Sequence, residues 1–130
     1  MIKFKKFYFF LICGFVASFV NFLSRIYLNQ FILISLNLSI IFSHLLGMII
    51  AFVLFKFFVS ESKKKISKSL FYFILVNFLS LLIIFIATYI SIKIFEYFLF
   101  INNLIITFSH GIALIITAFT SFFLHKKFTY

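Results

Sequence analysis

Four long apolar stretches, separated by short polar breaks, restrict the fold of this chain more than any other feature. They cover roughly residues 7–28, 38–59, 70–92 and 104–124. A helix of about 22 residues is about 33 Å long, enough to cross a hydrocarbon core of about 30 Å. Because lipid offers no partner for backbone amides, each stretch is predicted to be helical. The sequence therefore predicts an all-α polytopic membrane protein, with four transmembrane helices in one domain over residues 1–130.

The composition excludes a water-soluble domain. Hydrophobic residues make up 65% of the chain and charged residues only 11%, whereas a soluble domain carries about 25% charged residues. A chain of 130 residues cannot hide this much apolar surface in its own core.

The basic residues gather at particular breaks between the apolar stretches. Ten of the twelve lie before the first stretch, around the break between the second and third, where Lys56 is still within the end of the second stretch, or after the fourth. The positive-inside rule then predicts that both termini and the middle loop lie in the cytoplasm. We expect the protein in the inner (cytoplasmic) membrane. The net charge of +10 lies beside the membrane, so anionic lipids are the expected partner and nucleic acid is not. Arg25 and Lys93 are the two exceptions.

Short motifs recur between the two halves of the chain. The tripeptide FSH occurs at 42–44 and at 108–110, and FYF occurs at 7–9 and at 71–73. The spacing of 64 to 66 residues would relate two helix pairs that both begin and end in the cytoplasm, which is a parallel repeat. Chance matches between Phe-rich segments are the alternative explanation.

Polar side chains at membrane depth are costly and therefore mark candidate functional positions. Arg25 lies one turn after Asn21 on the same helix face, and the guanidinium fork suits a phosphate group. The alternative for Arg25 is a side chain that snorkels to the interface. His44 and His110 occupy matching places in the proposed repeat. They are expected either to contact a headgroup, with a titratable pair as a variant, or to cap the starts of helices.

Four further residues have two interpretations each. Lys56 and Lys126, near the cytoplasmic ends of their spans, fit either a lipid phosphate or plain positive-inside anchoring. Asn77 and Thr120 lie in mid-membrane, where polar side chains either hold helices together or line a path for a sugar.

The sequence contains no residue pattern that is typical of a catalytic site. It lacks a nucleophile–base constellation, a glycine-rich phosphate loop and a His-x-x-x-His pair, and it has one Cys and two acidic residues. We expect no enzymatic activity, no cofactor and no metal.

Several motifs together resemble one membrane protein family. They are CGF at 13–15, VNFLSR at 20–25, GM at 47–48, KFF at 56–58, SHG at 109–111 and HKKF at 125–128. In order and spacing they resemble the GtrA-like membrane proteins over essentially the whole chain. The chain departs from the family pattern at Phe15 and Phe55, where many members carry Gly and Asn.

The resemblance implies translocation of a polyprenyl-phosphate-linked sugar for the synthesis or modification of cell-surface polysaccharide. A membrane-associated glycosyltransferase would supply this lipid on the cytoplasmic face. In that scheme Lys56 and Lys126 receive the phosphate at the cytoplasmic side of the membrane. Arg25, with His44 and His110, holds it outside. The sugar hydroxyls pass Asn21, Asn77 and Thr120.

Two other functions stay open at this point. One alternative to translocation is a scaffold that recruits a glycosyltransferase without moving lipid. The other is a small multidrug exporter. The exporters resemble proton-coupled carriers with a Glu in the first span, which this chain lacks. Because four short helices enclose little space, we also expect a homo-oligomer or a complex.

Overall fold

The computed structural model describes the backbone of residues 2–58, 66–98 and 102–128, with side chains at 8–9, 11–54, 71–98 and 102–124. Its elements are α1 (Ile2–Ile26), a π-helical segment η1 (Tyr27–Phe31), α2 (Leu36–Phe58), α3 (Ile66–Phe98) and α4 (Asn103–Phe128). The described ranges contain no strand. Four of the helices are long and apolar enough to cross a membrane, which confirms the predicted all-α, four-span fold.

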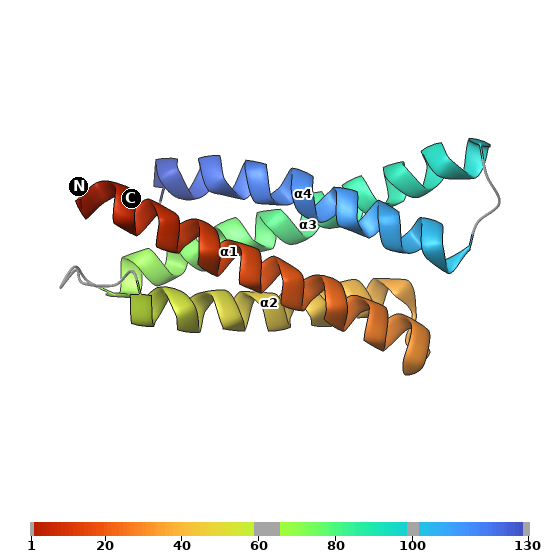
Figure 1. Cartoon of the computed structure of the whole chain (residues 1–130), viewed down its shortest axis with the longest axis horizontal. Coiled ribbons are helices and arrows are strands. Elements are labelled where there is room, and N and C mark those ends of the chain that lie inside the picture. The colour runs from red at the N-terminus through yellow and green to blue at the C-terminus, as the bar shows by residue number, and fades with distance from the viewer. Residues whose placement is uncertain (1, 59–65, 99–101, 129–130) are drawn as a thin grey trace. The chain divides into compact units, whose positions relative to one another are not determined.

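The chain divides into two compact units, Met1–Lys64 and Lys65–Tyr130. The first unit contains α1, η1 and α2, and the second contains α3 and α4. In each unit the two long helices run antiparallel and pack along their length (Figure 1). Large apolar side chains such as Phe15, Phe19, Phe119 and Phe123 are exposed, as expected of faces that contact lipid.

The first unit changes direction later than the sequence predicts. The predicted span of residues 7–28 ends before Asn29 and Gln30, but the helix continues through them as η1. The amide of Ile32 donates to the carbonyl of Tyr27 at 3.2 Å, which is the i+5 bond of a π-helix. The turn then follows at Leu33, which has a φ of 61°. The Nδ2 of Asn29 donates to the Ile34 carbonyl at 3.0 Å and so ties the turn to η1.

Gly47 sets the distance between α1 and α2. A Cβ atom at this position would lie 3.0 Å from the Ala17 carbonyl oxygen and 3.2 Å from Asn21 Cβ. Both distances are tighter than most Cβ contacts in proteins, so a larger residue would push the helices apart by a few tenths of an ångström. Small residues are the usual means of packing helices closely in lipid. The contact also fixes the register of the two antiparallel helices.

In the second unit, α3 is longer than the predicted span of residues 70–92. It continues to Phe98, because the sequence has neither Gly nor Pro in these turns to stop it. Lys93 Nζ lies 3.3 Å from Glu96 Oε2, an i,i+3 pair that supports the extension. Asn102 Oδ1 accepts the Ile105 amide at 2.9 Å and caps the start of α4.

The buried positions of the two units follow the same pattern. In α1 they are Cys13, Ala17, Asn21 and Arg25; in α3 they include Val76, Ser80, Ile84 and Thr88. The α2 set of Ser43, His44 and Gly47 likewise corresponds to Ser109, His110 and Ala113 in α4, which lie 66 residues later. This agreement supports a repeat of the two-helix unit.

The buried positions of α1 match those of α3 at a spacing of 63 residues, as from 13 to 76. The FYF motif instead repeats at a spacing of 64 residues. Tyr8, Phe71 and Tyr72 of that motif are exposed, so packing between helices does not fix their positions. The FSH motif includes buried residues and keeps its spacing of 66.

Candidate functional site

The buried face of α1 carries two polar side chains in the C-terminal half of the helix. Asn21 is 4% exposed and Arg25 is 0% exposed. They lie one turn apart on the face that Gly47 contacts, because residues at i and i+4 share a helix face. A snorkelling Arg25 would keep its guanidinium exposed, and the complete burial of this side chain does not agree with that alternative.

The guanidinium of Arg25 lacks a hydrogen-bond acceptor within the described part of the chain. Its Nε, Nη1 and Nη2 atoms are all unpaired there, and so is Oδ1 of Asn21. The sequence explains why no carboxylate approaches: the only acidic residues are Glu61 and Glu96. Glu61 lies outside the described residues, and Glu96 pairs with Lys93. Arg25 is therefore a buried cation without an anion from its own helix pair.

The face of α2 that packs against α1 carries small hydroxyl side chains. From the Gly47 contact, the antiparallel register places Ser43 one turn nearer to Arg25 along α2. Ser39 Oγ donates to the Ser35 carbonyl at 2.9 Å, and Ser43 Oγ donates to the Ile40 carbonyl at 3.1 Å. Both hydroxyls are fully buried and satisfied by their own helix. The surroundings of Arg25 are therefore polar but uncharged.

The two predicted histidines are buried, one in each unit. His44 lies on the buried face of α2, in the same half of the first unit as Arg25, whereas His110 lies in α4. Neither caps a helix start, because α2 begins at Leu36 and α4 begins at Asn103 after its Asn102 cap. That alternative for the two histidines is wrong.

The other predicted site residues belong elsewhere or cannot be placed. Asn77 Nδ2 donates to the Phe73 carbonyl at 2.8 Å. Thr120 Oγ1 donates to the Ile116 and Thr117 carbonyls at 3.0 and 3.1 Å. These donors are thus used within their own helices. The side chains of Lys56 and Lys126 lie outside the described residues.

Two hydroxyl side chains that the sequence analysis did not select are unusual. Thr88 and Ser109 are both 0% exposed, and neither Thr88 Oγ1 nor Ser109 Oγ has a hydrogen-bond partner in the described residues. The repeat gives the only signal for them, since Thr88 corresponds to Arg25 and Ser109 to Ser43.

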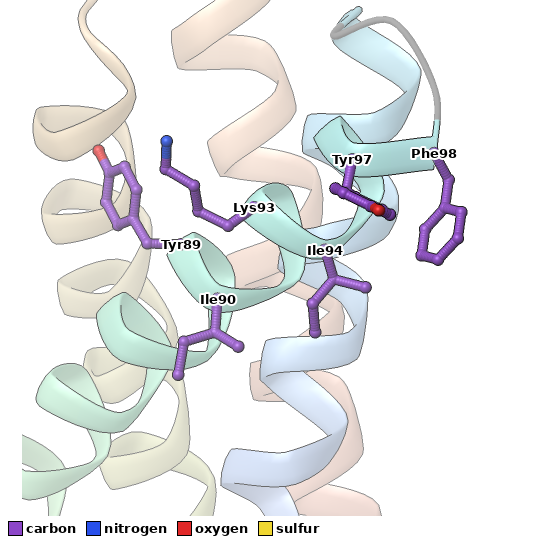
Figure 2. A pocket seen from close by; sticks show the side chains of 6 residues that line it. All are labelled: Tyr89, Ile90, Lys93, Ile94, Tyr97 and Phe98. Carbon is purple, nitrogen blue, oxygen red and sulfur yellow. The ribbon is translucent and has the colours of Figure 1, made fainter.

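An open depression of about 540 Å³ follows the last turns of α3. It is lined by Tyr89, Ile90, Lys93, Ile94, Tyr97 and Phe98 (Figure 2). Tyr and Lys side chains at the end of a span are typical of the membrane–water interface. Lys93 has Glu96 as its partner, so the charge of this exposed lysine is neutralised while that of the buried Arg25 is not.

Within the part of the chain that the structure describes, no group of three or more His, Cys, Asp or Glu side chains is close enough to hold a metal ion.

The fold and the site together define a multi-pass helical membrane protein with a buried cationic site in one two-helix unit. The chain belongs to the GtrA/DPMS transmembrane domain family, whose model matches residues 9–130. Among curated proteins and among solved structures, none matches. Membership of this family links the chain to membrane processes that involve polyprenyl-phosphate sugars.

Proposed function

We propose that this protein moves a polyprenyl-phosphate-linked sugar across the cytoplasmic membrane for cell-surface polysaccharide synthesis or modification. The polyprenyl tail of such a lipid stays in the bilayer, so only the sugar phosphate has to cross. A bare charge in hydrocarbon is costly. A protein lowers that cost when it supplies a cation and hydrogen-bonding groups inside the membrane.

The observation that carries this proposal is the fully buried guanidinium of Arg25, which has no hydrogen-bond partner among the described residues. Arginine binds phosphate through two parallel N–H···O bonds, and such charge-assisted bonds are the strong ones. A phosphate on Arg25 would neutralise the charge and use donors that the described chain leaves unsatisfied. Asn21 Oδ1, one turn away and also without a partner in the described residues, can accept a hydrogen bond from a sugar hydroxyl of the same ligand.

The remaining predicted residues extend this proposal along the path. Lys56 and Lys126 would receive the phosphate at the cytoplasmic side, and His44 and His110 would assist near the opposite side. Asn77 and Thr120 are weaker candidates for the sugar path than Asn21, because their own helices already accept hydrogen bonds from them.

We further propose that the protein has no catalytic activity of its own and works with a membrane-associated glycosyltransferase that loads the lipid. Each described unit is a single pair of helices, which encloses little volume. A homo-oligomer or a complex with the glycosyltransferase would complete the shielding of the sugar phosphate.

Lipid flipping in proteoliposomes tests the proposal. The purified protein is reconstituted with a polyprenyl-phosphate hexose, and a membrane-impermeant oxidant reports the sugar that reaches the outer leaflet. We expect the protein to expose the inner pool, and Arg25→Ala to slow this by at least about tenfold, since a hydrogen bond to a charged group is worth about 1.5–3 kcal/mol.

Lys93→Ala is the matched control. It also removes one positive charge, but from an exposed side chain that is paired with Glu96, so flipping should persist at the wild-type rate. If folded wild-type protein exposes no more sugar than empty liposomes, the proposal is wrong. Co-purification of a glycosyltransferase with such an inactive protein would then favour the scaffold.

A further inference from the structure

We infer that the Arg25 site binds a phosphate with a single negative charge, and so distinguishes the sugar-loaded lipid from the sugarless lipid by charge. This inference deepens the proposed function and rests on it. The phosphate of the loaded lipid is a diester and carries one charge. The sugarless polyprenyl monophosphate is a monoester, which carries nearly two charges well above its second pKa of about 6. One guanidinium balances the first charge exactly once and leaves the second unbalanced.

Arg25 supplies one positive charge, and the nearby sequence supplies no other permanent charge. Residues 17–47, which form the half of the first unit next to its turn, contain no other Lys or Arg and no Asp or Glu. Lys6 is about 28 Å from Arg25 along α1 at a rise of 1.5 Å per residue. The backbone of Lys56 follows Gly47 on α2 and lies on the other side of the α1–α2 contact from Arg25.

The polar groups near Arg25 do not favour a second negative charge either. The Ser39 and Ser43 hydroxyls already donate to carbonyls of their own helix. Asn21 Oδ1 has no partner among the described residues. As an acceptor it opposes a second phosphate charge, but it pairs with a sugar hydroxyl or with the P–OH group of a protonated monoester. The site therefore suits a ligand that carries one charge and one hydroxyl donor.

Complete burial makes this balance of charges decisive. Arg25 is 0% exposed, so water does not screen charges in the closed site. A dianion bound there would leave one negative charge without a partner, and an uncompensated buried charge is costly. The monoester consequently binds as its protonated monoanion, whereas the diester binds without taking up a proton.

One titratable side chain offers another place for that proton. The elements that pack along α1 are α2 and η1. Buried His44 lies on α2 in the same half of the unit, whereas Tyr27 of η1 is 58% exposed and Cys13 lies three turns before Arg25. If His44 took up the proton, the monoester would bind as a dianion between two cations with the same dependence on pH. A His44 variant separates the two cases.

Binding of three lipids to the full-length protein, in nanodiscs of zwitterionic lipid, tests the inference. The probes are a polyprenyl-phosphate hexose, the methyl diester of polyprenyl phosphate, and polyprenyl monophosphate. We expect the affinity of both diesters to be independent of pH. The Kd of the monoester should increase about 50-fold from about pH 6 to about pH 8, because the bound lipid carries one proton that the free dianion lacks. At the higher pH the methyl diester, which has no sugar, should bind more tightly than the monoester.

Three variants assign this pattern to Arg25. Arg25→Ala should weaken the binding of all three lipids. Lys93→Ala removes an exposed charge that is paired with Glu96, and it should keep the wild-type pattern. His44→Gln should keep the pH dependence of the monoester, whatever its effect on affinity.

The inference is overturned if the monoester binds at about pH 8 as tightly as the methyl diester, which would show that charge does not distinguish the lipids. It is also overturned if His44→Gln abolishes the pH dependence, since His44 would then supply a second positive charge. Either result, with the hexose lipid still bound, leaves the proposed function standing. A wild-type protein that binds none of the three lipids would instead overturn the proposed function, and the inference with it.

Discussion

An unpaired charge inside a helix pair destabilises a membrane protein unless a partner neutralises it. Arg25 is such a charge: its three nitrogens have no partner in the part of the chain that the structure describes, and residues 1–58 contain no acidic residue. Residues at functional sites often destabilise the fold, and favourable interactions elsewhere in the chain offset this cost. We therefore expect Arg25 to have opposite effects on stability and on ligand binding, and the two can be measured separately.

Replacement of Arg25 should change stability and ligand binding in opposite directions. Arg25→Met replaces the guanidinium with an apolar side chain, so we expect the lipid-free protein to become more stable by about 1–4 kcal/mol. Polyprenyl monophosphate should stabilise the wild type through mass action but leave the variant unchanged. Thermal unfolding in detergent, with and without this lipid, measures both effects. A less stable Arg25→Met protein would show that the arginine has a structural partner.

At the scale of the elements, small residues decide how closely the helices of a unit approach. Ala17, Ser43 and Gly47 lie at the α1–α2 interface, and Ser80, Ser109 and Ala113 occupy the corresponding positions in the second unit. Lipid tails are as apolar as leucine side chains, so helices in a membrane associate through close packing and not through the hydrophobic effect. The two glycines of the first unit allow a direct comparison.

The second prediction compares Gly47→Ala with Gly14→Ala. The new Cβ at position 47 would meet a backbone oxygen at 3.0 Å, which no rotamer change can relieve, so we expect a loss of about 1–3 kcal/mol. At position 14 nothing lies within 4 Å, and alanine should stabilise the helix by up to about 1 kcal/mol. Denaturant unfolding of both variants tests this, and equal stabilities would contradict the described α1–α2 contact.

At the scale of the whole molecule, the distribution of charge predicts the topology. The basic clusters before α1, between the two units and after the fourth span predict that both termini and residues 59–65 face the cytoplasm. The turn at Leu33 and the Asn102 cap would then face the other side. This arrangement places the Arg25 half of the first unit toward the non-cytoplasmic face.

The third prediction tests this topology. Cys13 is the only cysteine and is buried, so a Cys13→Ala background allows single labelling sites. In intact cells a membrane-impermeant maleimide should label Asn102→Cys and Leu33→Cys but not Ser62→Cys. Ser62→Cys should react only after the membrane is opened. Labelling of Ser62→Cys from outside would invert the topology and the proposed direction of transport.

The sequence by itself determined the class of this protein, its four helices and its family. These properties follow from features that local composition records, namely the lengths of apolar runs, the positions of basic clusters and the order of short motifs. The sequence also located Arg25 and Asn21, because an arginine within an apolar run is conspicuous wherever its side chain points.

Only the tertiary structure decided which polar groups are buried and which are already satisfied. Asn77 and Thr120 looked like path residues in the sequence, yet their donors bond to their own helices. Thr88 and Ser109 looked ordinary, yet they are buried and their hydroxyl oxygens have no hydrogen-bond partner among the described residues. The physical reason is that the satisfaction of a hydroxyl depends on its rotamer and on the helix packed against it, and the composition of a span does not specify either of these.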